Sequence, residues 1–343
     1  MNAGDARAVE FTAPRDVGVI DIPVPAPGPD EVLVETAVSA VSAGTELLVY
    51  RGDLDQQTVA DEELAALNGD FSYPLRYGYS VVGTVTSVGD GVDPAWEGRT
   101  VFGFNPHESH FVADPNDLHP VPGGLDPETA ALFANVETAV NFALDGAPRI
   151  GERVAVFGQG VVGLLTTAVL ARSSAETVVA VEPRDRRREL AADLGADRTV
   201  DPTEVDTAGV VRDLTGGVDL AVELSGRPET LEVAVDSTGF DGRVLVGSWY
   251  GTKRAELGFG DHFHRDRVTV ESSQVSTIAP ELRGRWDRER RRETAWRELR
   301  RLMTEHRIAG RLVTDRVSVD DAPTAYRRLA ADDTEAIQVM FTY

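Results

Sequence analysis

The stretch RVAVFGQGVVGLLTTAVLARSSAETVVAVE, residues 153–182, decides the fold of this chain. It begins with a short apolar run that ends at Phe157, and three glycines follow in the spacing G-x-G-x-x-G. An apolar run of helical length covers 161–171, and a second strand-like run over 177–181 ends on Glu182. Strand, glycine turn, helix, strand and acid in this order predict a βαβ unit that binds a dinucleotide.

Each glycine of this motif has its own physical task. Gly158 permits the tight turn, Gly160 lets a pyrophosphate approach the backbone because it has no Cβ, and Gly163 lets the helix pack closely on the strand. The start of the helix offers backbone N–H groups and the positive end of its dipole to the phosphates. The residues expected to hold the pyrophosphate are Gly158, Gln159, Gly160, Val161, Val162 and Gly163.

Glu182 is the acidic residue of the motif, about twenty residues after the glycines. Its carboxylate is expected to accept hydrogen bonds from the adenosine ribose hydroxyls and to repel a 2′-phosphate. The sequence therefore predicts NAD as the cofactor and makes NADP the less favoured choice. Arg184, two residues further on, is a second candidate contact to the cofactor.

The composition restricts the classes of partner. The 343 residues contain 57 acidic and 34 basic side chains, which gives a formal net charge of −23, and Lys253 is the only lysine. A nucleic acid is excluded as a partner because phosphate binding requires a basic face. Such an acidic surface, almost without lysine, predicts a protein of a salt-loving organism, in which carboxylates keep the chain hydrated. The alternative is an ordinary acidic protein of the cytosol.

The chain contains no cysteine, so disulfides, thiolate metal sites and cysteine nucleophiles are excluded. The N-terminal residues lack the pattern of a signal peptide, and no apolar run has the length of a membrane span. We therefore expect a cytoplasmic protein without a membrane partner.

The chain length suggests about two domains. Short apolar runs broken by Pro and Gly up to about Phe104, with a polar and helical stretch before Pro74, predict a partly open β-barrel. A helix over 128–144 and then alternating strands and helices predict a parallel, doubly wound sheet, and the tail returns to the barrel. The expected fold class is α/β, and the expected domains are a nucleotide domain, 126–272, and a catalytic domain, 1–125 with 273–343.

This order resembles the medium-chain dehydrogenase/reductase superfamily of the zinc alcohol dehydrogenase type, over nearly the whole chain. Segments similar to the family's occur in the family's order: GTVTSVGDG at 83–91, RIGERV at 149–154, LGAD at 194–197 and RVLVG at 243–247. The resemblance implies a GroES-like β-barrel domain, a Rossmann nucleotide domain, and hydride transfer between the nicotinamide and a small alcohol or carbonyl compound. It also implies a homodimer or homotetramer joined through the nucleotide domain.

Three segments narrow the branch of the family. VSAGTELLVYRG at 41–52, ANVETAVN at 134–141 and SSQVS at 272–276 resemble relatives that lack the zinc motifs. These relatives include the bacteriochlorophyllide a dehydrogenase branch and threonine-dehydrogenase-like oxidoreductases.

The family's zinc motifs are present here without their ligands. Ala43 stands in the C-G-T-D-like ligand segment, and Gly78-Tyr79-Ser80 stands where the family has G-H-E. A zinc site needs three protein ligands that carry nitrogen, sulfur or carboxylate oxygen, so we expect no zinc and no other metal. The alternative is an unusual site made by His107, Glu108, His110 and Glu46.

Without zinc, a hydrogen-bond donor must stabilise the charge that develops on the substrate oxygen. Tyr79 is the first candidate, because its hydroxyl can donate to a carbonyl oxygen; the alternative is a packing tyrosine at a barrel turn. Thr45 matches the hydroxyl of the family's proton relay, and Glu46 is expected to hold Thr45 or an arginine. His107 is a further candidate because an imidazole exchanges protons near neutral pH.

The resemblance also implies contacts to substrate and nicotinamide. His110 belongs to the loop on the substrate side of the family layout, and Trp249 follows a strand beside the nicotinamide. Arg285 is a candidate for an anionic substrate because a guanidinium fork suits such a group; the alternative is that the arginines of this region belong to a solvated helix face. Glu137 and Asn141 lie one helical turn apart and are expected to face the cleft, unless they form a satisfied pair at a domain junction. The further expected cofactor contacts are Ser225, Gly247, Ser248 and Gln274.

Three functions remain open from the sequence. The first is an NAD-dependent, zinc-independent alcohol or ketone oxidoreductase. The second is an NADPH-dependent quinone or enone reductase, against which Glu182 argues. The third is a dinucleotide-binding sensor without turnover, which the missing zinc ligands permit.

Overall fold

The computed structural model describes residues 5–60, 65–67, 69–331 and 334–343. The chain forms two compact units, one of residues 1–134 with 299–343 and one of residues 135–298. We call them the barrel unit and the nucleotide unit. The nucleotide unit therefore begins later and ends later in the chain than the predicted domain 126–272.

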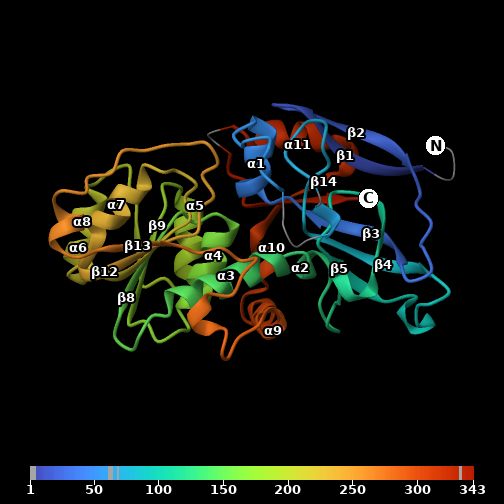
Figure 1. The fold of residues 1–343 in the computed structure, drawn as a ribbon. Helices are drawn as coiled ribbons and strands as arrows, with labels where there is room; N and C mark the ends of the chain where they lie inside the picture. The colour runs from blue at the N-terminus through green and yellow to red at the C-terminus, as the bar shows by residue number, and fades with distance from the viewer. Residues whose placement is uncertain (1–4, 61–64, 68, 332–333) are drawn as a thin grey trace. The chain divides into compact units, whose positions relative to one another are not determined.

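A parallel sheet forms the centre of the nucleotide unit (Figure 1). Its six strands lie in the order β10-β9-β8-β11-β12-β13. Its strands are β8 (Arg153–Phe157), β9 (Thr177–Val181), β10 (Arg198–Val200), β11 (Val218–Glu223), β12 (Thr238–Val246) and β13 (Thr269–Ser272). The order runs outward from β8 to β10 on one side and from β11 to β13 on the other. A topological switch point therefore lies between β8 and β11, where ligands of such sheets bind beyond the carboxyl ends of the strands.

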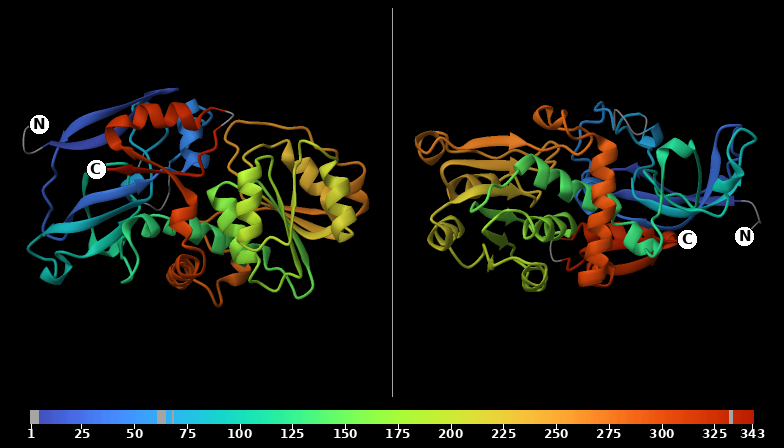
Figure 2. Two further views of the ribbon diagram at one scale, coloured as in Figure 1. Left: turned by 180° about the vertical axis from the view of Figure 1, so that it is seen from behind. Right: turned by 90° about the horizontal axis from the view of Figure 1, so that it is seen from below.

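Helices cover both faces of this sheet (Figure 2). Val154 and Val156 of β8 pack with Leu170 on one face, which carries α3 (Phe133–Gly146), α4 (Val161–Leu170) and α5 (Asp185–Asp193). Ala155 and Phe157 point to the other face, which carries α6 (Thr207–Thr215) and α7 (Thr230–Ser237). Because both faces are buried, β8 is an unbroken apolar run, as the sequence predicts. The doubly wound fold is confirmed.

The barrel unit is built on a sheet in the order β14-β15-β3-β4-β5-β7, with β6 paired to β3. Its strands are β3 (Val32–Ala40), β4 (Val81–Val88), β5 (Thr100–Gly103), β6 (His110–Ala113), β7 (Leu118–Pro120), β14 (Val313–Ser318) and β15 (Gln338–Thr342). The strands β1 (Asp5–Ala13) and β2 (Asp16–Pro23) form a separate antiparallel pair. β15 pairs with the end of β3, so the tail of the chain does return to the first domain.

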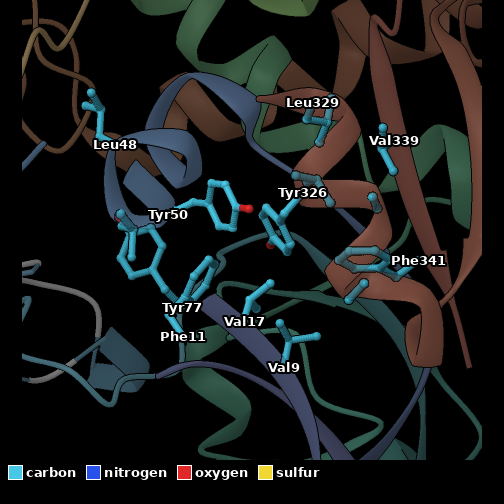
Figure 3. Packing of buried hydrophobic residues seen from close by; sticks show 14 of the residues in the cluster. Val9, Phe11, Val17, Leu48, Tyr50, Tyr77, Tyr326, Leu329, Val339 and Phe341 are labelled. Atoms are coloured by element: carbon cyan, nitrogen blue, oxygen red, sulfur yellow. The ribbon is translucent and has the colours of Figure 1, made fainter. Parts of the chain in front are cut away.

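The core of the barrel unit joins both ends of the chain (Figure 3). Tyr326 of α11 (Ala322–Leu329) is completely buried and lies against the rings of Phe11, Tyr50 and Phe341. Tyr50 belongs to α1 (Ala43–Arg51), which this packing fixes in place. The position of α1 matters below, because its first turn carries candidate site residues.

Two expectations about helices need correction. The helix predicted over 128–144 is divided into α2 (Pro127–Ala130) and α3, because the chain turns between Ala131 and Leu132. The helical stretch predicted before Pro74 falls partly on 61–64 and 68, outside the described residues. What is described between Arg51 and Pro74 contains only the short 3-10 turn Ala65–Leu67.

The remaining helices are α8 (His262–Arg265), α9 (Arg288–His306) and α10 (Ile308–Leu312). In the described part of the chain, no helix combines the length and the apolar character needed to cross a bilayer.

Candidate functional site

The glycine turn in the nucleotide unit has the geometry that a pyrophosphate requires. Gly158 has φ +89°, and a Cβ there would meet the backbone of Ser225 at 2.6 Å. A Cβ on Gly163 would lie 1.9 Å from the carbonyl oxygen of Gly158. The start of α4 can therefore approach the turn this closely only because residue 163 has no side chain. Gly160 differs, because a Cβ there would meet no atom within 4 Å. The space beside Gly160 therefore lies open to a ligand.

Gly160 is also the N-cap of α4 and has no side chain to bind the first N–H groups of this helix. Val161 and Val162 occupy the first helical positions, and their N–H groups have no partner within the helix. These groups and the helix dipole together favour an anion. A dinucleotide pyrophosphate thus fits the site.

Glu182 is fixed beside this turn. Its carboxylate accepts hydrogen bonds from the Gln159 N–H at 2.8 Å and from the Arg184 N–H at 3.2 Å. Only 3% of Glu182 is exposed. The acid predicted to bind the ribose is therefore held at the carboxyl end of β9, next to the glycine turn.

The side chain of Gln159 points away from any ligand. It is completely buried, donates to the Val156 carbonyl at 3.1 Å and accepts from the Thr167 hydroxyl at 3.0 Å. It ties the turn to α4, so Gln159 can offer a cofactor only its backbone.

Ser225, Gly247 and Ser248 meet at the carboxyl ends of β11 and β12. The Gly247 and Ser248 N–H groups donate to the carbonyl of Glu223 at 3.0 and 3.2 Å, and the Ser248 hydroxyl accepts from the Gly226 N–H at 2.9 Å. Trp249, which follows them, is 43% exposed. The structure thus brings together these expected contacts of the nicotinamide half of the cofactor.

The structure does not bring Gln274 and Arg285 into this group. Gln274 is exposed and its side-chain oxygen accepts the Ser276 N–H at 2.6 Å, which closes a local turn. Arg285 is exposed as well. Their roles stay predictions without support from the local geometry.

Glu137 and Asn141 are held by a side chain that the sequence did not single out. Arg291 of α9 is 1% exposed, and its guanidinium donates to Glu137 Oε1 at 2.9 and 3.1 Å and to Asn141 Oδ1 at 2.8 Å. Both residues are buried. The structure therefore pairs them within the nucleotide unit, as the alternative interpretation expects, and a substrate role for them remains a prediction.

In the barrel unit, Tyr79 and Thr45 lie together with Ser42. The Tyr79 hydroxyl is hydrogen-bonded to the Ser42 hydroxyl and lies 3.4 Å from the Thr45 hydroxyl. Ser42 is the N-cap of α1, and Thr45 belongs to the first turn of this helix. Three hydroxyl groups thus form one cluster, which we call the Tyr79 cluster. Burial raises the pKa of the Tyr79 phenol, although the Ser42 hydrogen bond acts in the opposite direction.

Glu46 and His107 lie next to this cluster but have no exposed surface. Glu46 Oε2 lies 3.1 Å from His107 Nε2 and also accepts a hydrogen bond from the Tyr326 hydroxyl. Glu46 Oε1 accepts the Ser42 N–H at 2.7 Å. Because they are completely buried, Glu46 and His107 can influence a substrate only through the residues that they hold.

The other side of His107 is fixed as well. His107 Nδ1 and the Ser39 hydroxyl are hydrogen-bonded at 2.7 Å, and the same hydroxyl lies 2.8 Å from the Tyr343 hydroxyl. A Cβ on Gly78 would lie 2.8 Å from the imidazole ring, so the residue before Tyr79 packs directly on His107. The Glu46–His107 pair therefore holds both the helix that carries Ser42 and the segment that carries Tyr79.

His110 does not join this group. Its ring Nδ1 lies 3.1 Å from the Ser109 hydroxyl, and the side chain is half-buried at the start of β6. The two histidines of one loop thus have different surroundings, which the sequence alone did not distinguish.

Comparison with known proteins places this geometry in a family. The profile of the family described as zinc-binding dehydrogenase matches residues 161–289. The L-threonine 3-dehydrogenase of Pyrococcus horikoshii is 30% identical over 266 residues, which cover 68% of this chain and 73% of that protein. The chain belongs to the zinc-type alcohol dehydrogenase family. It is accordingly an NAD(P)-dependent oxidoreductase of the medium-chain type, as the sequence predicts.

Solved structures agree on the fold. A protein from Escherichia coli described as a short chain alcohol dehydrogenase complexed with NADH has a TM-score of 0.79 at 17% identity, with 99% of this chain and 100% of that one covered. A protein from Sinorhizobium meliloti described as a putative zinc-binding dehydrogenase bound to NADP has a TM-score of 0.76 at 20% identity, with 99% of each chain covered. One neighbour holds NADH and the other NADP, so the fold does not decide between the two cofactors.

The side chains at the zinc-motif positions of this alcohol dehydrogenase homologue do not suit zinc. Ala43 has no donor atom, Tyr79 is hydrogen-bonded to Ser42, and the Ser80 hydroxyl donates to the Ala131 carbonyl at 2.6 Å. Glu46 and His107, two of the alternative ligands, are already bound to each other and to buried hydroxyl groups. Within the described ranges, no three His, Asp or Glu side chains are grouped so that they could hold a metal ion.

Sequence reasoning missed several residues of these clusters. Tyr326 and Tyr343 lie far from Glu46 and His107 in the chain, Ser39 lies far from its partner His107, and no local motif marks these three residues. Glu223 had a detectable signal, because β11 (VDLAVE) ends on an acid in the same way as the run TVVAVE that ends on Glu182.

Proposed function

We propose that this protein is an NAD-dependent, zinc-independent oxidoreductase that transfers a hydride between nicotinamide and an alcohol or carbonyl substrate. One observation carries the proposal: at the zinc-motif position, the Tyr79 hydroxyl is hydrogen-bonded to Ser42 and lies near Thr45. A hydroxyl held in this way can donate a hydrogen bond to a substrate oxygen, which is the task that zinc performs in other members of the family.

When bound, the reduced cofactor supplies the hydride to the carbonyl carbon. The Tyr79 hydroxyl donates its proton to the carbonyl oxygen as negative charge develops there. The resulting phenolate is stabilised by the Ser42 hydroxyl, and Thr45 is the second hydroxyl within reach. In the oxidation direction the same groups remove the alcohol proton.

The pKa of Tyr79 bears on the proton that the two directions need. Burial raises this pKa above the ordinary value for tyrosine, so the phenol keeps its proton at neutral pH and is ready to donate it in carbonyl reduction. Alcohol oxidation needs the deprotonated phenol as the base, and the fraction of this form increases under alkaline conditions.

Glu182 supports the choice of NAD. Its carboxylate is held beside the glycine turn by two backbone N–H groups, and its charge opposes a 2′-phosphate. Lower affinity for NADH than for NADPH would reverse this choice.

The test is a screen of carbonyl compounds and alcohols, including L-threonine, at high salt with NADH or NAD⁺. The Tyr79→Phe variant is measured beside wild type, with Tyr77→Phe as the matched control in the same segment. We expect Tyr79→Phe to lower kcat by about 10²- to 10⁴-fold, the usual contribution of a general acid, and to bind NADH as wild type does. Turnover of Tyr79→Phe equal to that of wild type would remove Tyr79 from the mechanism.

We further propose a homodimer or homotetramer in the cytoplasm of a salt-loving organism. The formal charge of −23 supports the last point, because salt screens the repulsion between carboxylates. Light scattering at several salt concentrations would give the oligomeric state and its dependence on salt.

A further inference from the structure

A buried carboxylate at the end of β11 has no role in the function proposed above. Glu223 is the last residue of this strand and has no exposed surface. The next residue, Leu224, donates its N–H to the carbonyl of Phe157 at 2.8 Å. Glu223 therefore lies beside the strand that leads into the glycine turn, at the switch point of the sheet.

Both oxygens of the Glu223 carboxylate accept hydrogen bonds from neutral groups. Oε1 accepts from the N–H of Ser225 at 2.8 Å and from its hydroxyl, and Oε2 accepts from the Tyr250 hydroxyl at 2.5 Å. Burial and the nearby carboxylate raise the pKa of Tyr250, so its phenol keeps the proton that it donates. Two accepting oxygens are the pattern of an ionised carboxylate.

This negative charge has no cationic partner. In the part of the chain that the structure describes, the Glu223 carboxylate accepts hydrogen bonds only from Ser225 and Tyr250, and none of the ion pairs there involves Glu223. Glu182, the other strand-end acid, differs because Arg184 lies 3.6 Å from its carboxylate. A buried carboxylate without a cation produces a strong local negative potential.

The sheet order indicates which part of the cofactor would feel this potential. The pyrophosphate fits the start of α4, after β8, and Glu182 fixes the adenosine half at the end of β9, on one side of β8. The nicotinamide half must then extend to the other side of β8, over the ends of β11 and β12. Glu223 is the buried charge at that end of the sheet.

We propose that Glu223 is an electrostatic determinant that favours the oxidised nicotinamide, which is a cation, over the reduced nicotinamide, which is neutral. This inference rests on the dinucleotide binding in the proposed function, but not on the substrate or on Tyr79. Glu223 thus has a different effect on the affinity for NAD⁺ than on the affinity for NADH. This effect is additional to the support that its hydrogen bonds give to the turn at Ser225.

The test is the ratio of the dissociation constants of NADH and NAD⁺, measured by titration calorimetry for wild type and Glu223→Gln. Glutamine keeps the shape of the side chain and removes its charge. A single buried charge changes such a ratio by about tenfold, so NAD⁺ affinity is expected to fall about tenfold relative to NADH affinity. An equal loss of affinity for both cofactors, or no loss, would show a merely structural role and overturn the proposal.

Tyr250→Phe is the second variant and decides the question if Glu223→Gln does not fold, as judged by circular dichroism. It keeps the carboxylate but removes a donor that offsets the charge, so the preference is expected to move about twofold toward NAD⁺. An unchanged preference, or a shift toward NADH, would then contradict the proposal. A wild-type protein that binds neither NADH nor NADPH would instead refute the proposed function.

Discussion

The nucleotide unit and the barrel unit differ in how their functional residues are assembled. In the nucleotide unit, the glycine turn and Glu182 lie within thirty consecutive residues, 153–182, and keep the parts that the family uses. In the barrel unit, the zinc-motif positions carry Ala43, Tyr79 and Ser80, and the buried network is drawn from distant parts of the chain. The glycine turn thus has the form that a dinucleotide requires, whereas the zinc-motif positions carry side chains that do not suit zinc.

The two units bind their groups in different ways, and this determines which site tolerates amino-acid substitutions. A pyrophosphate is bound by backbone N–H groups, so the geometry of the turn must persist whatever the substrate. A zinc ligand is a side chain, and once it is lost the surrounding groups can form other hydrogen bonds. Here Glu46 and His107 bind each other and support the Tyr79 cluster.

The largest effect is expected from His107→Ala. This change leaves the completely buried Glu46 without its imidazole partner and removes the ring on which Gly78 packs. The free energy of unfolding is expected to fall by about 3–5 kcal/mol, measured by urea denaturation. His110→Ala is the matched control in the same loop, with an expected loss of about 1 kcal/mol or less, because His110 is half-buried and pairs with Ser109. Equal losses in the two variants would contradict a special role for the buried pair.

Gly163→Ala is expected to have the next largest effect, on the nucleotide unit. Its Cβ would lie 1.9 Å from the Gly158 carbonyl oxygen, so we expect a loss of about 2–3 kcal/mol in unfolding free energy. Gly160→Ala is the control, because its Cβ would meet no atom within 4 Å. It is expected to change stability little but to weaken NADH binding at least about tenfold. Unchanged NADH binding in Gly160→Ala would place the pyrophosphate elsewhere.

Glu182→Gln tests the choice of cofactor. The amide oxygen can keep one of the two hydrogen bonds from the Gln159 and Arg184 N–H groups, and the substitution removes the charge that repels a 2′-phosphate. The preference for NADH over NADPH, measured by fluorescence titration, is expected to decrease about tenfold. A wild-type protein that prefers NADPH would show that Glu182 does not select the cofactor.

The smallest effect is expected from a change in pH, measured on kcat/KM for carbonyl reduction. Because the pKa of Tyr79 is raised by burial, the protonated phenol persists beyond the usual range of tyrosine near pH 10. The kcat/KM for carbonyl reduction is therefore expected to stay flat up to about pH 10 and to fall only above it. A descending limb near pH 6–7 would instead indicate a histidine as the proton donor.

The fold was largely predictable from the sequence, because its signals are local. The apolar strands and the helix after Gly160 mark the doubly wound sheet, and the closing segment at 337–343 forms β15. The prediction of secondary structure failed where tertiary contacts determine the path of the backbone. The pattern of residues 128–144 predicts one helix, yet the chain turns at Ala131 and Leu132, and both of these side chains are completely buried.

The candidate site was predictable only in part. Thr45 and Tyr79 follow from motif positions, and the structure brings their hydroxyls within 3.4 Å of each other. The complete burial of His107 and its contacts with Glu46 and Ser39 arise only when the chain folds, as does the contact of Glu46 with Tyr326. No periodicity or spacing in the sequence reports such contacts.

In the proposed function, the Tyr79 hydroxyl, and not zinc, acts on the substrate oxygen. The most direct test is the zinc content per chain, measured by mass spectrometry together with turnover, before and after dialysis against a chelator. We expect far less than one zinc per chain and the same turnover in both samples. One zinc per chain, with turnover that disappears on chelation and returns when zinc is added back, would contradict it.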